Sequence, residues 1–226
     1  LRHLIETTLA ESDAPRLRLS SLEPWDLEED FFSLWENPRL CRHLHLPLQS
    51  GCEATLRRMA RKVTPHSFAR LVETARAAAP ELAVTPDVIV GFPGETAEEF
   101  TQSLRFVEQM QFAAGHVFNY SARPGTPAAR LPQQVAPPLR KARSAEMRAV
   151  LAAASLRYRL AFTGGEQEGL WESAAQVAEG GFRLEGLTSN YLRVSAPCGE
   201  ARWNQINRVR LQGLTADGMY GSICED

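Results

Sequence analysis

The stretch Leu82 to Phe100, which reads LAVTPDVIVGFPGETAEEF, constrains the fold of this chain more than any other segment. Its apolar run ends at Gly91, passes through a glycine-containing turn and continues as a helix-like segment with acidic residues in its first turn. A buried strand that leads directly into a helix is typical of α/β folds with parallel strands. Asp87 interrupts the apolar strand, so we expect its carboxylate to face a polar partner or a ligand. An ordinary tight turn between a strand and a helix explains the glycines equally well.

Three more strands are expected, at Arg16–Ser20, His43–Leu46 and His116–Tyr120, with helical segments between them. Strands that alternate with helices pair in parallel through right-handed crossovers, so the sequence predicts an α/β fold. Polar residues follow the carboxyl end of each strand, where parallel sheets and barrels gather their functional groups. These residues are Ser20, Ser21, Glu23, Gln49, Ser50, Glu95, Ser121 and Arg123. Four strands cannot close a barrel, so we expect either an open sheet or part of a barrel.

Composition and cysteine usage limit the class of protein and the cellular compartment that we expect. A net charge of −2 over 226 residues argues against a strongly basic nucleic-acid-binding protein but allows a local basic face. The four cysteines, at positions 41, 52, 198 and 224, match neither a disulfide framework nor a CxxC metal site, which favours a reducing, cytoplasmic compartment. No signal peptide or membrane-length apolar run is visible, so no membrane partner is expected. Because Leu1 begins within a helical pattern, without a methionine or a cap, we expect a fragment of a longer protein.

The composition changes after Thr126. Residues 127–138 contain four prolines and indicate an extended linker, and a basic helix is expected from Leu139 to Phe162. Five short alternating runs follow, separated by turn signals, which predict a small β-barrel of the kind that binds oligonucleotides. Residues 161–226 contain five arginines and nine acidic residues, so RNA binding there requires arginines gathered on one face or the neighbouring basic helix. A β domain that only packs against its neighbour is the alternative.

Four motifs occur in a fixed order: RLRLSSLEP, HLHLPLQSG followed by LRRMARKVT, TPDVIVGFPGET, and FNYSARPGTPAA. Together they resemble the radical S-adenosylmethionine (radical SAM) methylthiotransferases, and the terminal β module is similar to the TRAM domain of that family. The segments RLSSLEP and CRHLHLPLQSG are most similar to those of the branch that methylthiolates N6-threonylcarbamoyladenosine beside the tRNA anticodon. Sister branches act on isopentenyladenosine in tRNA or on an aspartate of a ribosomal protein.

This resemblance implies a partial radical SAM barrel followed by a small all-β TRAM barrel. The implied divisions are residues 1–136 for the last four strands of a six-stranded partial barrel, 137–163 for a basic linker helix and 164–226 for the TRAM domain. The family holds its catalytic 4Fe-4S cluster through a CxxxCxxC motif on the first barrel strand, and a second cluster through an amino-terminal domain. This chain contains neither, so we expect it to be inactive as given, with no catalytic residue or metal ligand identified. The uncovered edge of Arg16–Ser20 would favour a non-native dimer.

The resemblance also implies roles for residues at the strand ends. Enzymes of this family reductively cleave S-adenosylmethionine to a 5′-deoxyadenosyl radical, which abstracts hydrogen from a C–H bond before sulfur insertion. The residues implied to bind the methionine and ribose parts of the cofactor are Ser21, Glu23, Gln49 and Ser50. Those implied to bind its adenine are Ile89, Val90 and Gly91. The residues implied to bind tRNA are Arg123, Arg140, Lys141 and Arg143. Arg123 could instead form a structural ion pair with Glu23 or Glu95, and we weigh this role equally with substrate binding.

Several alternatives stay open at this point. His43 and His45 lie on one face of their strand and could bind metal, but a structural role is favoured because no third ligand is in register. Tyr191 and Trp203 suit base stacking, although core packing is favoured. The second functional hypothesis is a cluster-free α/β protein with an RNA-binding TRAM-like module, and a methylthiotransferase branch acting on a ribosomal protein is a third. A branch similar to coproporphyrinogen oxidase is disfavoured by the β module.

Overall fold

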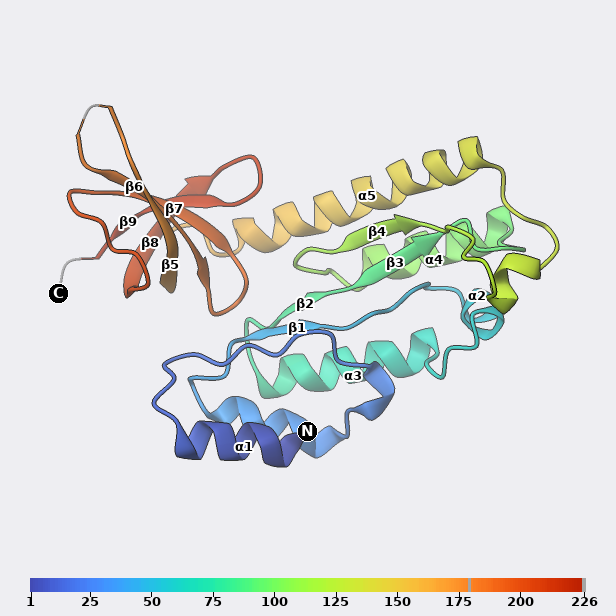
Figure 1. Cartoon of the computed structure of the whole chain (residues 1–226), viewed down its shortest axis with the longest axis horizontal. Helices are drawn as coiled ribbons and strands as arrows, with labels where there is room; N and C mark the ends of the chain where they lie inside the picture. Colours follow the sequence, from blue (N-terminus) through green and yellow to red (C-terminus); the bar gives the residue numbers. More distant parts are fainter. Residues whose placement is uncertain (179, 225–226) are drawn as a thin grey trace.

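The computed structural model describes residues 1–178 and 180–224 (Figure 1). An α/β part is followed by the long helix α5 (Pro137–Leu160), which leads into a small closed β-barrel. The mixed α/β class and the small carboxyl-terminal barrel predicted from the sequence are thereby confirmed. Within the described part of the chain, no helix combines the length and the apolar character needed to cross a membrane.

Four short strands form the α/β part, and all of their pairings are parallel. They are β1 (His43–His45), β2 (Ala83–Thr85), β3 (Asp87–Val90) and β4 (His116–Asn119). β1 pairs with β2, and β3 pairs with β4. The single strand expected through Val90 is thus divided at Pro86, because proline has no N–H to donate to a ladder. An isolated parallel bridge between Gln49 and Val88 continues the connection across the break.

The strand expected at Arg16–Ser20 is wrong, because this segment forms only one parallel bridge, between Leu17 and Leu40. The Leu17 N–H donates to the Arg39 carbonyl at 2.8 Å, and the Cys41 N–H donates to the Leu17 carbonyl at 2.8 Å. A bend follows at residue 42, before β1 begins, so the partner backbone turns away and the ladder stops. The segment nevertheless keeps the neighbour and the direction that a parallel strand would have.

Helices cover this core and share one apolar cluster. α1 (Arg2–Glu11) and the 3₁₀ helix η2 (Glu29–Glu36) pack together, and η2 also contacts α3 (Pro65–Ala78). α4 (Ala97–Gln109) contacts α5, which also lies along β3 and β4 (Figure 1). The short α2 (Glu53–Arg58) follows β1. The largest fully buried side chains of this part are Phe32, Leu40, Leu44, Leu46, Leu48, Leu56, Phe68, Phe112 and Met147.

The carboxyl-terminal strands close into a barrel in the order β5-β6-β7-β9-β8. They are β5 (Glu166–Gln176), β6 (Phe182–Thr188), β7 (Arg193–Cys198), β8 (Ile206–Leu214) and β9 (Met219–Ile223). Trp171 is fully buried and forms the centre of a separate apolar core with residues such as Leu184 and Leu211. Barrel closure pairs both edges of the sheet, which is how small all-β modules avoid exposed strand edges.

The turn between β6 and β7 connects the barrel to the α/β part. The Tyr191 ring stacks on His43 of β1, with 3.9 Å between ring centroids and an angle of 4° between planes. Arg18 Nη2 donates to the Thr188 carbonyl at 2.8 Å, and the Tyr158 hydroxyl of α5 donates to the Asn190 carbonyl at 3.0 Å. Tyr191 therefore packs between the two parts of the chain, which favours the structural interpretation over base stacking.

Candidate functional site

Two residues in the left-handed backbone region lie in the loops that follow residues 16–20 and β1. Ser21 has φ 52° and Gln49 has φ 68°, a conformation that is uncommon for residues other than glycine. Both are fixed by neighbouring strands: the Ser21 hydroxyl lies 3.0 Å from His45 Nδ1, and the Gln49 N–H donates to the Asp87 carbonyl at 2.8 Å. Backbone strain of this kind often occurs at ligand sites, so this rim is a candidate site.

Alternation along β3 places Asp87 and Ile89 on a partly exposed face and Val88 and Val90 on the buried face. Asp87 Oδ1 lies 3.1 Å from His45 Nε2 and 3.4 Å from His116 Nδ1. The polar partners of Asp87 are thus two histidines from the neighbouring strands. His43, two residues before His45, is instead buried and lies 2.9 Å from Thr85 Oγ1 through its Nε2 atom.

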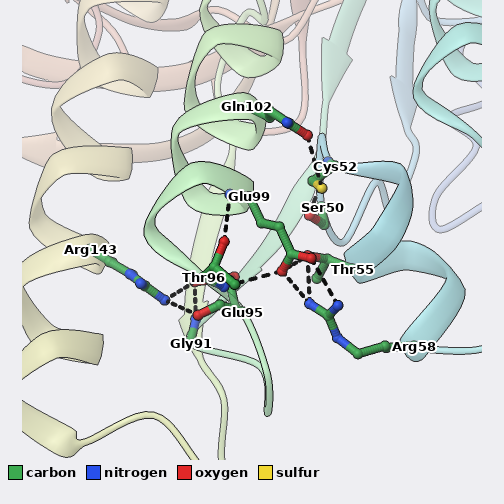
Figure 2. Close-up of polar contacts among 10 residues, drawn as sticks. All are labelled: Ser50, Cys52, Thr55, Arg58, Gly91, Glu95, Thr96, Glu99, Gln102 and Arg143. Atoms are coloured by element: carbon green, nitrogen blue, oxygen red, sulfur yellow. Dashed lines mark hydrogen bonds and ion pairs between the residues drawn. The ribbon is translucent and has the colours of Figure 1, made fainter. Parts of the chain in front are cut away.

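The turn after β3 is organised around the Glu95 carboxylate (Figure 2). Glu95 Oε1 accepts the Gly91 N–H at 3.0 Å and Arg143 Nη1 at 2.6 Å. Burial raises the pKa of Glu95, and the Gly91 N–H and Arg143 oppose that change. Gly91 has φ 71°, and Arg140 packs so closely that a Cβ at this position would lie 2.2 Å from Arg140 Cγ. The glycine is therefore required by the backbone conformation and by close packing of α5.

A second carboxylate, Glu99 of α4, links this turn to α2 (Figure 2). Glu99 forms an ion pair with Arg58, accepts the Thr55 hydroxyl at 3.3 Å and accepts the Thr96 N–H at 3.1 Å. The hydrogen bonds from Arg58 are the main cause that lowers the pKa of Glu99. Ser50, in the loop before α2, is buried, and its hydroxyl accepts the Cys52 N–H at 3.2 Å.

The loop that follows residues 16–20 is held by a third pair. Arg61 Nη2 lies 2.9 Å from Glu23 Oε2, and the Arg61 guanidinium also stacks over Trp25 at 4.7 Å from the ring centroid. Glu23 is consequently bound to a cation from the segment after α2. Both carboxylates suggested as structural partners of Arg123 are therefore already paired, Glu23 with Arg61 and Glu95 with Arg143.

The structure separates the four residues expected to bind tRNA. Arg123 and Lys141 are exposed, whereas Arg140 is half-buried and donates to the Tyr120 carbonyl. Arg143 is 5% exposed and is bound to Glu95, so the expectation that it contacts a phosphate is wrong in this conformation. Counting charges along the helix missed this, because the count does not reveal which arginines face a buried carboxylate.

The residues expected to bind the cofactor lie around the rim and differ in burial and in hydrogen bonding. Ser21, Gln49 and Ile89 are close to one another, since Gln49 bridges to Asp87 and Ile89 through its backbone and Ser21 contacts His45. Val90 is buried and its carbonyl accepts the Tyr120 N–H at 2.9 Å. Sequence reasoning missed the pairing of Glu23 with Arg61, the Glu99 contacts with Arg58 and Thr55, and the His45, Asp87 and His116 cluster.

The sequence and the fold are similar to those of known proteins. The family described as Radical SAM superfamily matches residues 3–107. Threonylcarbamoyladenosine tRNA methylthiotransferase MtaB of Thermotoga maritima is 35% identical over 90% of this chain and 46% of its own length. The tRNA-2-methylthio-N(6)-dimethylallyladenosine synthase of Akkermansia muciniphila is 33% identical over 92% of this chain and 45% of its own length. The chain therefore spans about half the length of these curated relatives.

A solved structure shows a similar fold. The coproporphyrinogen III oxidase HemN from Escherichia coli, described as a radical SAM enzyme, aligns with a TM-score of 0.54 over 67% of this chain and 36% of that one. At 21% identity, this likeness concerns the fold alone. S-adenosylmethionine and a 4Fe-4S cluster, the cofactors expected from the sequence, are those of the matched superfamily. By these matches, the chain is similar to the radical SAM superfamily over residues 3–107 and to tRNA methylthiotransferases over most of its length.

Proposed function

We propose that this chain is part of an S-adenosylmethionine-dependent enzyme that inserts a methylthio group into a modified adenosine next to the anticodon of tRNA. The observation that carries the proposal is the identity of 35–36% to two threonylcarbamoyladenosine tRNA methylthiotransferases over 90% and 93% of this chain. N6-threonylcarbamoyladenosine is the proposed substrate, and N6-dimethylallyladenosine is the alternative suggested by other relatives.

S-adenosylmethionine bound to a reduced 4Fe-4S cluster would supply the radical chemistry, and the residues of this chain would position it. We assign its polar groups to Ser21, Gln49 and Glu23 and its adenine to Ile89 and the turn at Gly91. The unusual backbone of Ser21 and Gln49 supports this, and the Gln49 side-chain amide has no hydrogen-bond partner in the described part of the chain. Ser50 and Val90, whose polar groups are already bonded, would contribute shape rather than hydrogen bonds.

The cysteines of this chain do not fit the cluster. Within residues 1–178 and 180–224, no three cysteine sulfurs come together, and Cys41 and Cys52 are buried at 2% exposure each. A 4Fe-4S cluster in this family needs converging thiolates. We therefore propose that the chain as given holds no stable cluster and is inactive without additional cysteine ligands. Iron and sulfide analysis after anaerobic reconstitution tests this, and a stoichiometric cluster would overturn it.

We propose three functional divisions, namely a partial radical SAM barrel at 1–136, a linker helix at 137–163 and an RNA-binding TRAM domain at 164–226. Free thiols at all four cysteines support a cytoplasmic setting. Arg123 and Lys141, both exposed, are the proposed phosphate contacts near the rim. The segment Arg16–Ser20 keeps one bridge in the described structure, so a further strand or a second copy could pair with it, and sedimentation would detect the dimer.

The decisive experiment is nucleoside mass spectrometry of tRNA from cells in which the gene is deleted. Loss of the methylthio group from N6-threonylcarbamoyladenosine, restored by the intact gene, is the expected result. Loss from dimethylallyladenosine alone would replace the substrate with that of the sister branch. Unchanged methylthiolation of both nucleosides would overturn the proposed function and would favour an RNA-binding protein without catalysis, or a ribosomal-protein substrate.

A further inference from the structure

Three metal-ligating side chains from three different strands meet on the partly exposed face of the α/β part. They are His45 from β1, Asp87 from β3 and His116 from β4, and their ligand atoms all lie within 4.8 Å of one another. Asp87 and His116 are direct register partners in the β3–β4 pair, so parallel pairing itself brings them together. The proposed tRNA modification assigns no role to this cluster, and the sequence alone identified no third ligand for the histidines.

The His45 ring has one bonded nitrogen and one unsatisfied nitrogen. Its Nδ1 atom lies 3.0 Å from the Ser21 hydroxyl, whose oxygen can accept a hydrogen bond from the Nδ1–H tautomer. Its Nε2 atom is buried and forms no hydrogen bond in the described part of the chain, although Asp87 Oδ1 is only 3.1 Å away. A histidine that binds metal through one nitrogen commonly donates the other N–H to an oxygen, which is the arrangement that Ser21 provides.

Two of the three ligand-atom separations suit a shared cation, and the third, between the two histidine nitrogens, is within 4.8 Å. Ligand atoms about 2.0–2.1 Å from a tetrahedral zinc ion lie roughly 3.3 Å apart. Asp87 Oδ1 lies 3.1 Å from His45 Nε2 and 3.4 Å from His116 Nδ1, on either side of that value. The His116 side chain is 66% exposed, whereas His45 and Asp87 are 18% and 22% exposed, so the cluster is open to solvent on the His116 side.

We propose that His45, Asp87 and His116 bind one divalent transition-metal ion through two imidazole nitrogens and one carboxylate oxygen. Imidazole ligands favour zinc, iron, cobalt or nickel over magnesium and calcium. This ligand set contains no thiolate, so it differs from the cysteine ligand set of an iron–sulfur cluster. Ser21 is a positioning residue that orients the His45 ring rather than a ligand.

His43 provides an internal contrast. It comes from the same strand and the same face as His45, but its Nε2 atom is paired with Thr85 Oγ1 at 2.9 Å and its ring is covered by Tyr191. It has no carboxylate beside it among the ion pairs of the described residues. The metal proposal therefore concerns His45 and its neighbours and does not extend to the histidine pair as a whole.

The test uses zinc titration calorimetry and the visible spectrum of the Co²⁺-loaded full chain. We expect one ion per chain and a cobalt spectrum without thiolate charge transfer. His116→Gln and Asp87→Asn should abolish this binding, and Ser21→Ala should weaken it by about 10-fold. His66→Gln, which changes an exposed histidine on α3, and Cys198→Ser with Cys224→Ser should leave binding unchanged.

Because His116 is exposed, His116→Gln is expected to fold normally, and circular dichroism checks this for every variant. A folded His116→Gln chain that binds zinc as tightly as the unmodified chain would overturn the proposal. So would binding that disappears in the cysteine variant, since the ion would then be held by thiolates. Saturable binding that is lost in His116→Gln and Asp87→Asn and is kept in the control variants supports a built site.

Discussion

Arg143 Nη1 lies 2.6 Å from Glu95 Oε1, and this buried ion pair connects the beginning of α5 to the turn that follows β3. The two side chains are 6% and 2% exposed. Arg143 also donates to the Glu95 carbonyl at 3.0 Å and lies over the Phe100 ring at 5.3 Å from its centroid. The same Glu95 oxygen accepts the Gly91 N–H, so helix, turn and strand end are held through one carboxylate.

Replacing Arg143 by Gln should lower the free energy of unfolding by about 3–5 kcal/mol, because Glu95 would remain buried without its compensating charge. Urea denaturation measures this. Lys141→Gln, two positions away on the exposed side of α5, is the matched control and should change stability by no more than about 0.5 kcal/mol. Equal stability of the two variants would contradict the structural role of the pair.

A double variant separates the lost charge from the lost packing. Glu95→Gln combined with Arg143→Leu removes both charges, so it should be less destabilised than Arg143→Gln alone. If the double variant is instead the less stable of the two, packing around the arginine stem and Phe100 dominates over the unpaired carboxylate.

Gly91→Ala should destabilise the protein more than Gly125→Ala. Both glycines have positive φ, 71° and 85°, so both substitutions share a backbone cost of about 1–2 kcal/mol. Only at Gly91 would the new Cβ collide with Arg140, whereas nothing lies within 4 Å of the same position at Gly125. Thermal unfolding of the two variants reports the difference, and equal losses would mean that Arg140 moves aside freely.

The strand-to-helix unit around Gly91 was predictable because its signals are local. The apolar run, the glycine turn and the Thr96 cap with Glu99 three residues later all act within a few residues. One continuous strand was expected through Pro86, so neither the break at this proline nor the change of partner that it allows was predicted. That change depends on which neighbour each half finds in the folded chain.

The contacts of the candidate site were harder to predict because they join residues far apart in sequence. The register that pairs Asp87 with His116 cannot be read from either strand alone. The basic character of α5 suggested an RNA-facing surface, but Arg143 lies on the same side as the buried Met147 and Leu151. A helical-face analysis would have placed it inward, since residues three or four apart share a face.

The stability of the junction with the β-barrel should depend on pH through His43. Burial lowers the pKa of His43 from 6.5 to about 3, and the nearby Arg18 charge adds to the effect. In the unfolded chain His43 therefore binds a proton below about pH 6.5, whereas in the folded chain it stays neutral until about pH 3. The contribution of neutral His43 to stability is full above pH 6.5 and is lost as the pH falls toward 3.

His43→Asn should remove this part of the acid destabilisation. The variant should be less stable than the unmodified chain at pH 7.5, because it loses the stacking on Tyr191, and the gap should narrow as the pH is lowered. Urea titrations at a series of pH values measure the gap, and taking the difference between the two chains cancels the effect of other titrating groups. A gap that stays constant between pH 7.5 and 4 would contradict the buried, neutral histidine.

Binding of tRNA should depend on the outer face of α5 rather than on its whole basic content. Lys141 and Arg148 are exposed and seven residues apart, so they lie on one side of the helix, two turns from each other. In the β-barrel, the exposed Arg183 and Arg193 line a cavity of about 570 Å³ that also contains Glu172, Glu185 and Asp217. Acidic neighbours there should weaken phosphate binding, because they offset the arginine charges.

Lys141→Gln with Arg148→Gln should therefore weaken tRNA binding and flatten its salt dependence, by nearly one unit of log–log slope for each duplex phosphate that is no longer neutralised. Filter binding at several salt concentrations measures both quantities. Arg183→Gln with Arg193→Gln is the comparison and should change the slope less. Because both pairs remove two exposed arginine or lysine charges, a non-specific effect of charge removal would be equal in the two. If only the barrel pair weakens binding and the α5 pair has no effect, the phosphate contacts lie on the β-barrel and α5 serves as a linker.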